Sequence, residues 1–82
     1  MRRIKPILAR ALNRNQILIL CSLDGYSNIT RQLEKISGSS GVPLSTLKLN
    51  ARILMDIGVI DCRGGAPRLT EMGRAIFSIM RM

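Results

Sequence analysis

The sequence predicts one small domain that is mainly α-helical and carries a single small β-hairpin. In four separate segments, apolar residues recur at intervals of three and four, the spacing of helices that bury one face. Near the carboxyl end, a Gly64-Gly65 pair separates two short runs that suit strands, as in a hairpin. The 82 residues leave room for one core, and aromatic residues make up only 2% of the chain. That core must therefore consist of aliphatic side chains.

Two helices are expected in the first part of the chain. Residues 1–12 predict an amphipathic basic helix, which we treat as a unit ahead of a domain at 13–82. Its apolar positions are Ile4, Ile7, Leu8, Ala11 and Leu12. Asn13 and Gln16 have the spacing of a capping box that opens a second helix. Residues 16–23 are also compatible with a strand, but the cap and the Asp24-Gly25 turn favour the helix.

A third helix follows the Asp24-Gly25 turn. Ser27 or Asn28 can cap it, and its apolar positions are spaced as on one helix face: Ile29, Leu33 and Ile36. We expect this helix to end at Gly38, because the run at 37–41 has the composition of a long, flexible turn.

Pro43 predicts the start of a fourth helix, since proline suits the first helical turn. One face of this helix carries Leu47, Ala51 and Leu54. Gly58 is expected to terminate it.

The hairpin and a last helix complete the expected order of elements. Residues 59–63 predict one strand and residues 66–69 a short return strand, whose Pro67 marks a sheet edge. Thr70 can cap a final helix with an apolar stripe at Met72, Ile76, Ile79 and Met80.

Basic residues dominate the charge of this protein. Thirteen Lys and Arg residues against five Asp and Glu residues give a formal net charge of +8, which attracts polyanions, nucleic acid first. The alternatives are a charged face that only keeps the protein in solution and a face that approaches an anionic membrane surface. No apolar run is long enough to span a membrane, and we expect a cytoplasmic protein.

The chain lacks the residue clusters that most catalytic and metal sites need. It has no histidine, no clustered carboxylates and no phosphate-cradling glycine loop. We therefore expect no enzyme activity, no catalytic residue, no cofactor and no metal. Cys21 and Cys62 show neither zinc-ligand nor CxxC spacing, so we expect core thiols, with a disulfide between them as the alternative.

The segment between residues 41 and 60 carries the motif that points to a function. It reads Gly41-Val42-Pro43-Leu44-Ser45-Thr46-Leu47, and later Ile57-Gly58-Val59-Ile60. This resembles the recognition-helix signature of winged helix-turn-helix transcriptional regulators of the prokaryotic and archaeal type, and residues 60–69 resemble their wing. The resemblance covers about residues 13–80 and implies a three-helix core plus wing, with additional N- and C-terminal helices.

The resemblance implies double-stranded DNA as the partner. A recognition helix at about 43–57 would lie in the major groove, and a wing at 59–69 would contact the adjacent backbone or minor groove. Hydroxyls of Ser45 and Thr46 would face phosphate, while Lys48 and Arg52 would reach phosphates or guanine acceptors. Leu49 offers only apolar contact, for example to a thymine methyl group. The expected DNA-binding residues are Ser45, Thr46, Lys48, Leu49, Arg52, Arg63 and Arg68, of which the last two flank the hairpin turn.

Some expectations concern partners other than DNA. The expected recognition helix is unusually apolar, with Leu44, Leu49, Ile53 and Met55. A winged-helix protein–protein interaction module of a larger assembly is therefore the alternative function, whereas RNA binding is disfavoured by the shortage of aromatic residues. A homodimer through the terminal helices is expected, since their apolar stripes exceed what so small a core absorbs. Asn50 lies at the edge of the core face, which leaves a base contact as a lesser alternative for it.

Overall fold

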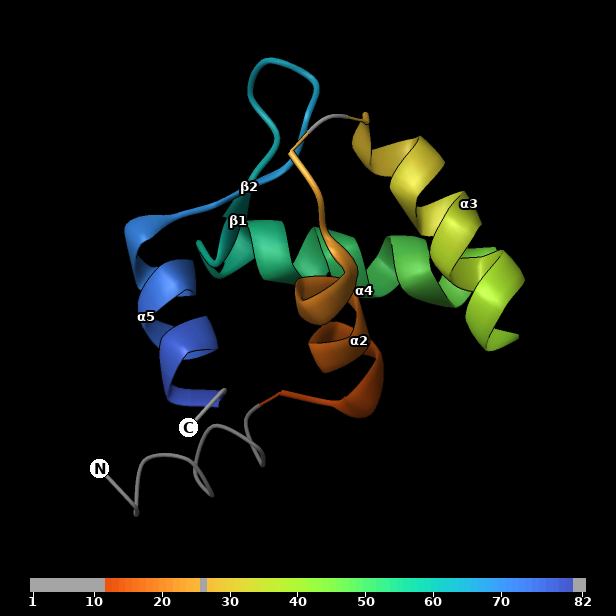
Figure 1. The fold of residues 1–82 in the computed structure, drawn as a ribbon, viewed down its shortest axis with the longest axis horizontal. Helices are drawn as coiled ribbons and strands as arrows, with labels where there is room; N and C mark the ends of the chain where they lie inside the picture. Colours follow the sequence, from red (N-terminus) through yellow and green to blue (C-terminus); the bar gives the residue numbers. More distant parts are fainter. Residues whose placement is uncertain (1–11, 26, 81–82) are drawn as a thin grey trace.

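The computed structural model describes residues 12–25 and 27–80. This part of the chain contains four helices and one two-stranded antiparallel hairpin, which confirms the mainly α-helical prediction (Figure 1). The elements are α2 (Arg14–Ser22), α3 (Ile29–Ser40), α4 (Leu44–Asp56), β1 (Ile60–Asp61), β2 (Arg68–Leu69) and α5 (Glu71–Met80). The helix predicted at residues 1–12 lies outside the described residues.

Helix α2 begins with the predicted capping box. The Asn13 side-chain oxygen accepts from the Gln16 backbone N–H at 2.8 Å, and the Gln16 side-chain oxygen accepts from the Asn13 N–H at 3.2 Å. Two amides at the start of the helix are satisfied in this way, which stabilises it by about 1 kcal/mol. The helical interpretation of this segment is confirmed, and the strand alternative is wrong.

Helix α3 is longer than the sequence predicts. Asn28 caps it by accepting from the Arg31 N–H at 2.8 Å, but the helix continues through Gly38 to Ser40. The Ser40 hydroxyl donates to the Ile36 carbonyl at 2.6 Å, and the chain turns only at Gly41, in the left-handed region at φ 78°. The expected helix end at Gly38 and the long turn at 37–41 were wrong. A glycine inside a helix costs only about 1 kcal/mol, so it need not end one.

Helix α4 matches its expected range of about 43–57 within one residue at each end. Beyond Ile57, Gly58 adopts φ 82° and donates to the Met55 carbonyl at 3.1 Å, while Val59 donates to the Leu54 carbonyl at 2.9 Å. These two bonds form a Schellman motif, so Gly58 terminates α4 as predicted.

The hairpin is shorter than the strands expected at 59–63 and 66–69. Ile60 pairs with Leu69 and Asp61 with Arg68, and the connection turns through Gly64 and Gly65 at φ 92° and 95°. Only glycine adopts such angles readily, which confirms the predicted position of the turn.

Thr70 joins the hairpin, the end of α4 and the start of α5. Its hydroxyl accepts from the Gly73 N–H at 3.0 Å, as expected of a helix cap, and donates to the Gly58 carbonyl at 2.5 Å.

Helix α4 lies at the centre of the fold, and α2 and α3 pack against it. The hairpin and α5 lie beyond the carboxyl-terminal end of α4 (Figure 1). The buried aliphatic core is Leu12, Ile19, Leu20, Leu33, Ile36, Leu47, Ala51, Leu54, Val59 and Ile60.

The cysteines differ from their prediction. The sequence predicted two core thiols, with a disulfide between them as the alternative, and both predictions were wrong. Both cysteines are free; Cys21 is exposed and Cys62 is half-buried.

Candidate nucleic-acid interface

Helix α4 presents most of the predicted DNA-binding residues on one exposed face. Its buried residues are Leu47, Asn50, Ala51 and Leu54. On the opposite face, Ser45, Lys48, Leu49 and Arg52 follow one another at helical spacing, and all four are exposed. Thr46 lies at the edge of this face and is half-buried. The arrangement leaves two cationic side chains and a leucine available to a partner.

The amino-terminal end of α4 favours a negatively charged partner. No side chain caps the helix at Pro43, and its first turn contains no acidic residue. The backbone N–H groups of this turn have no acceptor within the helix, and the helix dipole adds a partial positive charge there. Ser45 and Thr46 contribute hydroxyl donors at the same end.

Asn50 does not belong to the exposed face. It is 5% exposed, and its side-chain oxygen accepts from the Asn13 amide at 2.8 Å and the Gln16 amide at 3.2 Å. Its own amide donates to the Thr46 carbonyl at 2.8 Å. A contact between Asn50 and a base edge is therefore ruled out in this arrangement. The residue instead fixes α4 to the start of α2.

The hairpin carries the two remaining predicted residues, Arg63 and Arg68, and both are exposed. Sequence reasoning missed the partner of Arg63. Its Nε lies 3.0 Å from Asp61 Oδ2, and its backbone N–H donates to Asp61 Oδ1 at 2.9 Å. Only the short i, i+2 spacing of opposite charges signals this pair in the sequence.

The Asp61 carboxylate is held in its charged form by Arg63. The backbone N–H of Arg63, and then its side chain, donate to the carboxylate and hold the pKa of Asp61 below its ordinary value of 3.8. At neutral pH the hairpin therefore carries a negative charge beside one of its two arginines.

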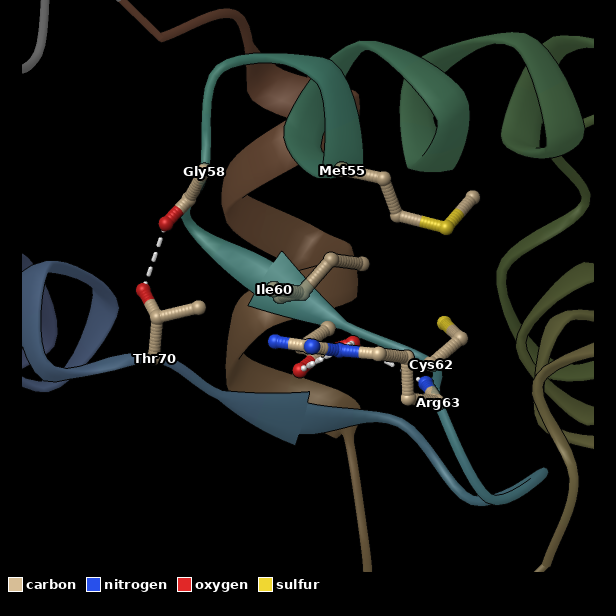
Figure 2. Close-up of a pocket in the computed structure, with 7 residues that line it drawn as sticks. Met55, Gly58, Ile60, Cys62, Arg63 and Thr70 are labelled. Atoms are coloured by element: carbon tan, nitrogen blue, oxygen red, sulfur yellow. Dashed lines mark hydrogen bonds and ion pairs between the residues drawn. The ribbon is translucent and has the colours of Figure 1, made fainter.

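A groove of about 510 Å³ separates the end of α4 from the hairpin (Figure 2). It is lined by Met55, Gly58, Ile60, Asp61, Cys62, Arg63 and Thr70. Figure 2 shows the Arg63 side chain directed back along β1, and Thr70 bonded to Gly58. Burial, and secondarily the charge of Asp61, raise the pKa of Cys62, so its thiol stays protonated and weakly nucleophilic at neutral pH.

The groove also locates the hairpin relative to the basic side of α4. Met55 lies seven residues after Lys48, on nearly the same side of the helix, and it lines the groove together with Arg63. The hairpin therefore flanks the side of α4 that carries Lys48.

Helix α3 carries two further exposed cations, Arg31 and Lys35. From the sequence, each is either a phosphate contact or a solvated charge.

Three further findings concern membranes, metals and relatives. Within residues 12–25 and 27–80, the helices are too short or too polar to cross a bilayer. The same residues contain no group of three or more His, Cys, Asp or Glu side chains placed to hold a metal ion.

Comparisons with protein-family models, curated proteins and solved structures found no match.

Proposed function

We propose that this protein is a winged helix-turn-helix transcriptional regulator that binds double-stranded DNA. Helix α4 is the recognition helix in the major groove, and the β1–β2 hairpin is the wing on the adjacent backbone or minor groove. The observation that carries the proposal is the exposed face of α4, where Lys48 and Arg52 lie next to Leu49, beside a hairpin with two exposed arginines.

The connection between α3 and α4 supports this proposal. Because α3 extends to Ser40, only residues 41–43 separate the two helices, and Gly41 makes the turn. A turn of three or four residues that often contains glycine is typical of the helix-turn-helix motif. The Ser37 hydroxyl donates to the Val42 carbonyl at 2.6 Å and helps to hold the turn.

The first prediction removes the two cations of the recognition face. A Lys48→Ala, Arg52→Ala double variant should raise the Kd for a mixed-sequence duplex about tenfold or more and lower the salt slope by about 1.8, because each lost phosphate contact removes about 0.9. Titration of wild type and variant at several salt concentrations measures both quantities.

The matched control is an Arg14→Ala, Arg74→Ala double variant. Both arginines are exposed and lie on α2 and α5, so the net charge falls by the same amount while the side chains of α4 stay unchanged. We expect the control to bind more nearly as wild type does. Equal loss in both double variants, or no salt-sensitive binding by wild type, would contradict DNA recognition by α4.

The second prediction concerns the acidic residue of the wing. Asp61→Asn should tighten DNA binding severalfold and steepen the salt slope by up to about 0.9, because it releases Arg63 and removes a negative charge. Glu71→Gln, the same charge change in the first turn of α5, is the control and should act more weakly. If the two variants bind alike, Arg63 does not act as a wing contact.

Asp61→Asn should also change how the thermal stability of the fold depends on pH. Because the pKa of Asp61 is lowered in the folded protein, its contact with Arg63 stabilises the fold above pH 3.8 and is lost as the pH falls through the lowered pKa. Wild type should therefore have a higher Tm than Asp61→Asn at neutral pH. In acid, below the lowered pKa of Asp61, the two Tm values should become equal.

The proposal includes a homodimer formed through the terminal helices. Of these, α5 is described, and its Ile76 and Phe77 are only half-buried against the core. A two-fold partner would cover more of this surface and present two recognition helices about 34 Å apart, one turn of DNA.

A second candidate function is a winged-helix protein–protein interaction module. The exposed apolar residues Leu49 and Ile53 on α4, and Ile57 at its C-cap, favour it. A stable protein partner combined with weak, salt-insensitive DNA binding would support this function over DNA recognition.

A further inference from the structure

Leu49 is the most exposed large hydrophobic side chain in the part of the chain that the structure describes. It is 61% exposed, although it sits in the middle of a helix whose opposite face forms the core. Ser45 lies one turn before it and Arg52 one turn after it, both exposed on the same face. The core does not require a leucine at this position, so its apolar surface is available to a partner.

The apolar surface continues from Leu49 along α4. Ile53 follows one turn later at 36% exposure, and Ile57 follows at 49%. Lys48 and Arg52 run beside this line, so α4 presents a basic line and an apolar line next to each other. Single exposed hydrophobic residues need no explanation, but an aligned series marks an interaction surface.

The charge beside the apolar line selects the partner. Lys48 and Arg52 complement a surface that carries negative charge along its edge. The major groove of DNA has phosphates along both edges, and the apolar group on its floor is the C5-methyl of thymine. An α-helix fits the width of that groove, so one face of α4 can meet both features at once.

We propose that α4 recognises thymine through contact between the Leu49 side chain and the thymine C5-methyl group. This inference rests on the proposed DNA binding and adds the base that is read. Lys48 and Arg52 hold the helix through phosphates, and Leu49 discriminates between base pairs. Each buried methyl group should tighten binding about fourfold, so the preferred duplex carries A·T pairs opposite the first half of α4.

Substitution of uracil for thymine tests the proposal directly, because it removes the C5-methyl group and leaves base pairing intact. The full chain is titrated with a duplex of alternating adenine and thymine and with the same duplex containing uracil, each at two salt concentrations. Wild type should prefer the thymine duplex about fourfold or more. Leu49→Ala should bind both duplexes equally and keep the salt dependence of wild type.

Cys21→Ala is the control, because Cys21 is an exposed, weakly polar side chain on α2, outside both α4 and the proposed dimer helix α5. It should keep the wild-type preference for thymine. Circular dichroism verifies that each variant is folded, and light scattering gives its oligomeric state.

The possible outcomes separate the two proposals. Salt-dependent binding with equal affinity for both duplexes overturns thymine recognition and leaves DNA binding in place. A thymine preference that persists in Leu49→Ala overturns the role of Leu49. Binding to neither duplex overturns DNA binding itself. A change of oligomeric state in Leu49→Ala assigns the apolar line to a contact between copies and also overturns the inference.

Discussion

Gly73→Ala is expected to destabilise the protein by about 3 kcal/mol or more, through a clash between α5 and the start of the hairpin. A Cβ atom at residue 73 would lie 2.1 Å from the Val59 carbonyl oxygen and 3.1 Å from its carbon. That oxygen also accepts from the Thr70 N–H at 3.1 Å. Because the obstacle is backbone, α5 must move, and the bonds of its cap are disturbed.

Thermal unfolding followed by circular dichroism measures this effect. For a domain of this size, Tm should fall by roughly 12 °C or more. Gly38→Ala is the control: Gly38 is exposed within α3, and a Cβ there would meet nothing within 4 Å. This variant should be more stable than wild type by about 0.5–1 kcal/mol. A Gly73→Ala protein as stable as wild type would contradict the packing of α5 on Val59.

Leu54→Ala is expected to cost about 2–5 kcal/mol, because it leaves a cavity at the centre of the core. Leu54 is 0% exposed on α4. The expected total stability of a domain this small is about 4–12 kcal/mol, so this one substitution removes a large part of it.

Urea denaturation distinguishes this loss from a change in the unfolded state, since the midpoint should fall with little change in the m-value. Leu49→Ala makes the same chemical change at a 61% exposed position of the same helix and should stay within about 0.5 kcal/mol of wild type. Similar losses in the two variants would show that the assigned buried and exposed faces of α4 are wrong.

The features that the sequence predicted correctly depend on neighbours in the chain. The buried face of α4 followed from the spacing of Leu47, Ala51 and Leu54. The capping box at Asn13 and Gln16 is also local, because its two bonds join residues three positions apart. The turns at Gly58 and at Gly64-Gly65 are local too, because they depend on the conformational freedom of the glycines themselves.

The features that the sequence did not predict depend on distant contacts or on small differences in local energy. Asn50 is buried because it meets Asn13 and Gln16, more than thirty positions earlier in the chain. The end of α3 was misplaced because Gly38 costs the helix only about 1 kcal/mol and does not end it; the chain first adopts the left-handed conformation at Gly41. The Cys21 side chain is exposed because it points away from the faces of α2 that α4 covers, which composition alone does not indicate.

The side-chain amides of the buried Gln16 and Asn50, together with that of the exposed Asn13, also set the rotation of α4 about its own axis. Aliphatic side chains in a core can exchange places at small cost, whereas these amides are satisfied in one arrangement only. A turn of α4 by one residue would swing its outward face through about 100° and leave the buried amides of Gln16 and Asn50 without these partners. The direction in which Lys48 and Leu49 point is thus fixed by hydrogen bonds on the opposite face of α4, and a partner of the exposed face would not touch these bonds.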